Sequence, residues 1–146
     1  HFYNAYMTGK ALSPVLADAY GTDRRAYHLT ADYTWGWSVE KSLRQFTGTG
    51  DTSQHAGVTT PFPNALTSDF QSALEAAAAS DADVLAMVLF GDDMVRAVNI
   101  AYSMGLADDR KNVPVEARMK VLSIMNAIHN FVSGAGNYKR MNYLLN

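Results

Sequence analysis

The chain has 146 residues, 48% of them hydrophobic and 18% charged, so it can bury the core of about one domain and is not expected to be disordered. Its net charge of −2 provides no basic surface for nucleic acid, which we therefore exclude as a partner. It contains no cysteine, which excludes thiol catalysis, disulfides and thiolate metal sites.

The predicted elements begin with a helix over residues 7–20, whose apolar side chains recur at helical spacing and which Gly21 ends in the C-cap position. Residues 25–32, "RAYHLTAD", then predict a short strand. Ser38–Phe46 reads as a second helix, and the polar residues 47–54 as a loop.

A second strand is predicted over 56–63, where two prolines favour extended structure at its end. The next helix covers residues 69–80. Thr67 or Ser68 is expected to cap it, and Asp69 suits the positive end of the helix.

Val84–Phe90 is the strongest strand prediction, because seven consecutive apolar residues are typical of a central parallel strand covered on both faces. A helix over 91–105 follows, ended by Gly105. Apolar residues at helical spacing over 113–132 predict a further helix, and we expect 107–146 to form a mostly helical C-terminal extension.

Strands that alternate with helices predict an α/β fold: a three-layer, Rossmann-like lobe over residues 1–106, with a mainly parallel sheet and helices on both faces. In such sheets ligands bind beyond the carboxyl ends of the strands. "DYTWGW" follows the first predicted strand and "FGDD" follows the third, so both are expected at the same edge.

Sequence signatures for several kinds of chemistry are absent. There is no glycine-rich dinucleotide motif, no P-loop, no nucleophile elbow and no pair of histidines at metal-binding spacing. We therefore expect no cofactor and no metal site, and interpret His28 as a packed or sheet-surface residue. No stretch approaches the ~18 apolar residues of a membrane span.

Two groups of residues at the predicted edge have alternative roles. Asp92 and Asp93 suit the first turn of a helix, or Asp92 could act with Asp32 and Mg²⁺ in an enzyme of doubly wound fold. Tyr33 and Trp35 either belong to the core or form a platform for a small organic ligand. Trp37 is expected in the core, and a purely structural role for the rings also stays open.

Four stretches, "GKALSPVLADAYG", "AYHLTADYTWGWSVEKSL", "TTPFPNALTSDFQSAL" and "ADVLAMVLFGDDMVRAVNIAYSMGL", resemble consecutive pieces of the type I periplasmic binding proteins. The resemblance covers residues 5–106 and is strongest to substrate-binding components of ABC transporters for branched-chain amino acids, urea and short amides. It implies two α/β lobes that close on a ligand by hinge motion. This chain resembles the second lobe only.

The resemblance also implies which residues contact the ligand. The turn after the lobe's first strand supplies aromatic contacts, the turn after the third strand supplies others, and an acidic residue further on often meets a ligand amine. The corresponding residues are Tyr33, Thr34 and Trp35, then Phe90, Gly91 and Asp92, and finally Glu116.

The implied function is binding without catalysis. The expected partners are a small polar ligand, the missing first lobe and an inner-membrane ABC permease, in the periplasm. A ligand-sensing domain of the same fold is the alternative from within the family. The chain begins at His1 without a methionine or a charged leader, which we expect of a mature product, a fragment or an excised domain.

Overall fold

The computed structural model describes residues 4–106 and 120–123 of the chain. Helices and strands alternate through the first of these ranges, as the sequence predicted. In chain order the elements are α1 (Ala5–Tyr20), β1 (Ala26–Ala31), α2 (Thr34–Thr47), β2 (Gly57–Thr60), α3 (Thr67–Ala78), β3 (Val84–Val88), α4 (Gly91–Ser103) and β4 (Lys120–Ser123).

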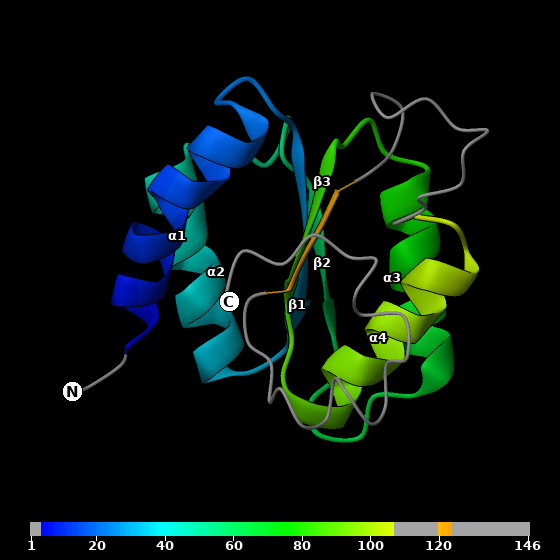
Figure 1. Ribbon diagram of the computed structural model, residues 1–146. Helices are drawn as coiled ribbons and strands as arrows, with labels where there is room; N and C mark the ends of the chain where they lie inside the picture. Colours follow the sequence, from blue (N-terminus) through cyan, green and yellow to red (C-terminus); the bar gives the residue numbers. More distant parts are fainter. Residues whose placement is uncertain (1–3, 107–119, 124–146) are drawn as a thin grey trace.

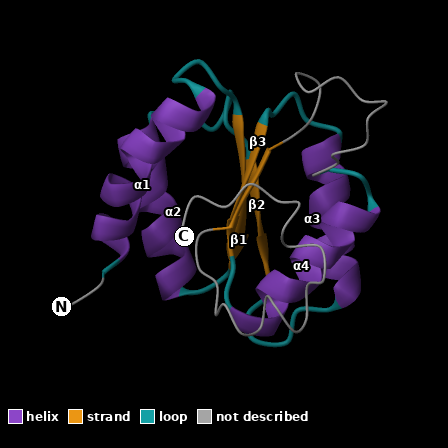
Figure 2. Cartoon of the chain, viewed as in Figure 1, coloured by secondary structure: helices purple, strands orange, loops and turns teal. Residues whose placement is uncertain are grey.

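The described strands form one parallel sheet in the order β2-β1-β3-β4. His28 of β1 lies opposite Gly57 of β2 on one side and Ala86 of β3 on the other. Helices α1 and α2 cover one face of the sheet, and α3 and α4 cover the other (Figures 1 and 2). The predicted three-layer α/β lobe is confirmed.

Strand β3 shows why a continuous apolar run was needed. All five of its residues are buried. Val84, Ala86 and Val88 pack in the same cluster as residues of α1 and α2, whereas Leu85 and Met87 belong to the core beneath α3 and α4. Because successive strand residues point to opposite faces, a strand between two helical layers must be apolar at every position.

The contact between α1 and α2 depends on Gly9. A Cβ atom at this position would overlap the backbone of Ser42, so only glycine allows the two helices to approach this closely. The hydroxyl of Ser42 donates to the carbonyl of Tyr6 at 2.8 Å, and that of Ser13 donates to the carbonyl of Phe46. Polar side chains thus bridge the helices where an apolar ridge would not fit.

Three helix starts differ from the predictions. Helix α1 begins at Ala5, two residues before the predicted residue 7. Helix α2 begins at Thr34, four residues before the predicted Ser38. Helix α3 has Leu66 as its N-cap, so Thr67 and Ser68 are the first helical residues and not its caps. The reason is Asp69, whose carboxylate accepts from the backbone N–H of Leu66 at 2.7 Å and thereby fixes the turn one residue earlier.

Strand β4 replaces part of a predicted helix. Apolar spacing predicted a helix over 113–132, but Lys120–Ser123 pair in parallel with β3. Periodicity alone does not distinguish a short buried strand from a helix. Here the segment forms a strand because it pairs with the free edge of β3. The sheet therefore includes four residues beyond 106. The division of the chain at 106 stays a prediction, and the rest of 107–146 lies outside the described residues.

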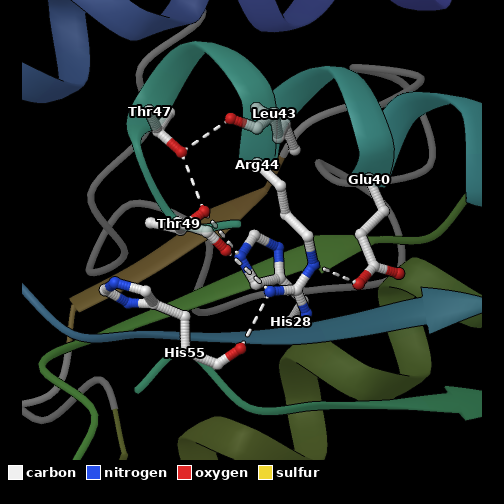
Figure 3. A network of polar contacts seen from close by, with 7 residues as sticks. All are labelled: His28, Glu40, Leu43, Arg44, Thr47, Thr49 and His55. Atoms are coloured by element: carbon white, nitrogen blue, oxygen red, sulfur yellow. Dashed lines mark hydrogen bonds and ion pairs between the residues drawn. The ribbon is translucent and has the colours of Figure 1, made fainter. Parts of the chain in front are cut away.

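A network of polar contacts fixes the segment between α2 and β2 (Figure 3). The guanidinium of Arg44 pairs with Glu40 at 2.7 Å within α2. It also donates to the backbone carbonyls of Thr49 and His55, each at 2.8 Å. Because the charge is largely buried, these bonds anchor the loop to the helix more firmly than an exposed pair would.

His28 lies in the same network at the centre of β1 and is only 2% exposed, as expected of a packed histidine. Its Nε2 contacts the hydroxyl of Thr49 at 3.2 Å. Burial, together with the positive charge of Arg44 and the proximity of His55, lowers its pKa from 6.5 to about 3. The imidazole is therefore neutral at physiological pH.

We expect acid to destabilise the chain through His28. The folded state binds a proton less readily than the unfolded state, so stability is fully present above pH 6.5 and is lost as pH falls toward the folded pKa of about 3. The expected slope from this one group is about 1.4 kcal/mol per pH unit within that window.

Urea unfolding at pH 7 and pH 5 measures this effect. The variant His28→Gln should be less stable at pH 7 but should lose less on acidification. The remaining loss is assigned to other groups such as His55, whose pKa burial also lowers. An identical loss in the variant would contradict the assignment.

Candidate functional site

The candidate site is the carboxyl edge of the sheet, where three strands lead into turns. Strand β1 leads through Asp32 into α2, β2 leads into the turn that starts at Pro61, and β3 leads through Phe90 into α4. The backbone N–H of Asp32 donates to the carbonyl of Thr60 at 2.9 Å, so the first two turns are held together. Because α2 and α4 leave neighbouring strands toward opposite faces, the crevice for a ligand is expected between β1 and β3.

Four aromatic rings form a continuous row along this edge. Phe62 stacks on Tyr33, with ring centroids 4.1 Å apart and planes at 18°. Tyr33 stacks on Trp35 at 5.8 Å and 30°, and Trp35 meets Phe90 edge to face at 6.4 Å and 67°. The edge-to-face pair has a separation and an angle that aromatic rings prefer, and the two stacked pairs bring ring faces close together. Below, the aromatic row means these four rings.

The aromatic row is half-buried in its middle and open at its ends. Tyr33 and Trp35 are of intermediate exposure, whereas Phe62 is 40% and Phe90 49% exposed. Tyr33 packs against the core on the α3 and α4 side, and Trp35 against the core on the α1 and α2 side. The row therefore spans both halves of the lobe and presents an apolar surface at the edge.

Of the predicted site residues on the first turn, the structure brings Tyr33 and Trp35 together. Tyr33 is the N-cap of α2, and Trp35 lies in its first turn and not before the helix. Thr34 is exposed between them, and its carbonyl accepts from the hydroxyl of Ser38 at 2.7 Å. The sequence missed Phe62, although its position directly after β2 marks it by the same rule that marked the others.

Trp37 is not in the core, contrary to the prediction. It is 51% exposed, and its Nε1 donates to a carboxylate oxygen of Asp32 at 3.0 Å. The buried face of α2 is formed by Gly36, Val39 and Leu43. Successive residues of a helix are rotated by about 100° about its axis. Because Gly36 lies on the buried face of α2, the next residue, Trp37, points away from that face.

Gly36 lies among these rings at a position where no larger residue fits. A Cβ atom there would overlap the carbonyl oxygen of Ala31 and approach Cγ2 of Thr30 to 3.2 Å. The first turn of α2 therefore lies directly against the end of β1. This close approach places Tyr33 and Trp35 at the edge of the sheet rather than above it.

The turn after β3 combines a left-handed glycine with two different carboxylates. Gly91 has φ +59°, and Phe90 is the N-cap of α4 without a side-chain cap. Asp92 is exposed, whereas Asp93 is buried and pairs with Arg96 at 3.0 Å.

Burial raises the pKa of Asp93, and Arg96 partly offsets this. Burial and then the charge of Asp93 also raise the pKa of Tyr33.

No observation on the described residues supports the alternative of a Mg²⁺-dependent enzyme. Within 4–106 and 120–123, no three His, Asp or Glu side chains are grouped so that they could hold a metal ion. Asp32 instead accepts from Trp37.

Glu116 lies outside the described residues, so its role stays a prediction. In the described part of the chain, no helix is long and apolar enough to cross a bilayer.

The chain belongs to the periplasmic binding protein family, because the family model described as "Periplasmic binding protein" matches residues 1–120. By this description the family is one of binding proteins. No significantly similar curated protein is found.

Solved structures with the same fold include a periplasmic binding protein from Burkholderia mallei. It is 24% identical, has a TM-score of 0.70 and covers 91% of this chain, which covers 32% of it. An amino acid ABC transporter substrate-binding protein from Pseudomonas fluorescens is 23% identical, with a TM-score of 0.64 and coverages of 84% and 30%.

A branched chain amino acid ABC transporter periplasmic ligand-binding protein from Burkholderia xenovorans is 19% identical. Its TM-score is 0.65, and the coverages are 89% of this chain and 31% of that one. The chain thus spans about a third of the length of the solved proteins that it resembles. These likenesses concern the fold of one lobe.

Proposed function

We propose that the chain is the second ligand-binding lobe of a solute-binding protein that serves an ABC transporter in the periplasm. Its ligand is a small polar molecule of the amino acid, urea or amide type, held in a cleft between this lobe and a first lobe supplied elsewhere in the full-length protein. A membrane permease receives the ligand. No catalysis takes place.

The observation that carries this proposal is the aromatic row at the carboxyl edge of the sheet. Ring faces of half-buried aromatics suit small organic ligands, since they supply apolar contact at low conformational cost. The exposed rings Phe62 and Phe90 are the surface that an opposing lobe and a ligand would cover. Tyr33, Thr34, Trp35, Phe90, Gly91 and Asp92 are the proposed contacts from the described turns.

The solved relatives support the class of ligand. Two with this fold are titled as amino acid or branched-chain amino acid transporter components. Another, from Rhodopseudomonas palustris, is titled as a complex with 4-hydroxybenzoate. Solved proteins with this fold thus carry titles that name amino acid transport and a complex with 4-hydroxybenzoate. A wall of rings that provides contact area, while polar groups elsewhere provide selectivity, fits such a range of ligands.

Titration calorimetry of the full-length protein tests the proposal. The ligands to be compared are leucine, acetamide, urea and 4-hydroxybenzoate, and we expect saturable one-to-one binding of at least one of the first three. Binding should be much weaker for the 146-residue chain alone, because one lobe covers only one side of a ligand. Binding of none of the three by the intact protein, or equal affinity for the isolated lobe, would contradict the proposal.

A further inference from the structure

The loop that carries Phe62 into the aromatic row is exposed along most of its length. It connects β2 to α3, and residues 61–64 are all exposed, whereas Ala65 is buried. Asn64 has φ +75°, a left-handed backbone that is uncommon for residues other than glycine. An exposed loop gains little from burial, so contacts from outside the loop must keep Phe62 stacked on Tyr33.

One such contact comes from Arg96 on α4. Its Nη1 donates to the backbone carbonyl of Ala65 at 3.0 Å, and its Nη2 donates to Oδ1 of Asp93 at 3.0 Å. The guanidinium carbon lies 5.5 Å from the ring centroid of Phe70, which belongs to α3 and is fully buried. One side chain of α4 thus contacts the loop, its own helix and the core under α3.

These contacts fix the direction of the guanidinium. Its donors lie in one plane at fixed angles, so two hydrogen bonds from two nitrogens leave it little freedom to rotate. The bond to Asp93 is charge-assisted, and this carboxylate is itself buried. The ring of Phe70 supports the guanidinium from a rigid part of the core. The carbonyl of Ala65 is therefore held by groups that do not belong to the loop.

Phe62 lies between two such attachments of the backbone. Before it, the carbonyl of Thr60 accepts from the backbone N–H of Asp32 at 2.9 Å. After it, the carbonyl of Ala65 accepts from Arg96. The first attachment joins the loop to the turn that carries Tyr33, and the second joins it to α4. Loss of the second would free one end of the segment that carries the Phe62 ring.

We propose that Arg96 is a positioning residue for the binding site, which holds the loop at Ala65 and thereby keeps the Phe62 ring stacked on Tyr33. Its effect on the ligand passes through Phe62. This inference rests on the proposed function, because it takes the aromatic row to be the surface that binds the ligand.

The ring contact itself is tested without a ligand, by nuclear Overhauser spectroscopy of the full-length protein with labelled Phe and Tyr rings. Phe62→Ala assigns the signals of Phe62. We expect a contact between the Phe62 and Tyr33 rings in the parent and its loss in Arg96→Met. Methionine keeps an apolar side chain beside Phe70, and urea unfolding checks that the variant is folded. A contact of parental intensity in Arg96→Met would overturn the inference.

A double-mutant cycle tests whether the effect on binding passes through Phe62. The probe is whichever of leucine, acetamide, urea and 4-hydroxybenzoate the full-length parent binds in calorimetry. For Arg96→Met we expect affinity to fall about tenfold, within the range for coupled neighbours. In the Phe62→Ala background the same change should cost less than about twofold. A tenfold loss in both backgrounds would show that Arg96 does not act through Phe62.

Two further variants separate this role from a general loss of charge. Arg96→Lys keeps the charge but not the planar fork, so we expect it to behave like Arg96→Met and not like the parent. The matched control is Arg25→Met, which removes an exposed guanidinium and its ion pair with Asp81 at 3.2 Å before β1. It should retain both the affinity and the ring contact. Parental affinity in Arg96→Lys, or an equal loss in Arg25→Met, would contradict the positioning role.

Failure of this inference and failure of the proposed function give different results. If the full-length parent binds none of the four compounds, the proposed function fails, and the ring contact still decides whether Arg96 positions Phe62. If the parent binds one of them and Arg96→Met binds it equally well, the positioning role fails and the proposed function stands.

Discussion

Replacement of Gly36 with alanine is expected to lower the free energy of unfolding by about 2–3 kcal/mol, the upper part of the range for overpacked sites. The added methyl group would overlap the carbonyl oxygen of Ala31, which belongs to a buried strand and cannot rotate away. Alanine is a better helix former than glycine by about 1 kcal/mol. We expect the steric term to outweigh this gain, because Cβ is fixed rigidly to the helix backbone and the carbonyl that it meets is part of the backbone of a buried strand.

Urea unfolding followed by tryptophan fluorescence measures this effect. Both tryptophans of the chain, Trp35 and Trp37, lie in α2, so the signal reports on the helix that must move. The control is Gly50→Ala, because a Cβ there meets no atom within 4 Å. Its stability should stay within about 0.5 kcal/mol of the parent. Equal stability of the two variants would contradict the close contact of α2 with β1.

Loss of the Tyr33 ring is the change expected to have the largest effect on binding, and this expectation rests on the proposed function. Tyr33 touches both Phe62 and Trp35, so its removal divides the aromatic row in two. For Tyr33→Ala in the full-length protein we expect affinity for its ligand to fall by about 30-fold or more, which is about 2 kcal/mol and typical of a central aromatic contact.

Calorimetry with the ligand identified for the parent protein measures the loss. The matched control is Trp37→Ala, which removes a large ring from the same helix but from outside the row. Its affinity should change by less than about threefold, since its contact with Asp32 is at the surface. If Trp37→Ala weakens binding as much as Tyr33→Ala, the row is not the binding surface.

The sequence predicted the layers of the fold because these depend on local patterns. The unbroken apolar run at Val84–Phe90 required helices on both faces, and β3 is buried at every residue. Gly21 ended a helix because a left-handed residue was needed, and it has φ +74°. Each of these signals lies within a few consecutive residues and requires no contact with a distant segment.

What the sequence missed depends on contacts between distant segments. Apolar spacing gave no sign that α2 begins at Thr34, because its first turn is fixed by the contact of Gly36 with β1. Trp37 was placed in the core for the same reason. Phe62 joined the site only once β2 was placed beside β1, and the strand at Lys120 only once β3 had an open side. No pattern within one segment encodes these pairings.

The open ends of the aromatic row also affect how a lobe of this kind behaves in the test tube. Phe62 and Phe90 are large and half-exposed, and they are connected through the rings between them. The aromatic row is therefore a continuous apolar surface that favours association. Copies of an isolated lobe should associate through it at high concentration. Dyes, tags and immobilising groups therefore belong at the opposite edge of the sheet, in the polar loop around Gly50 and Thr52.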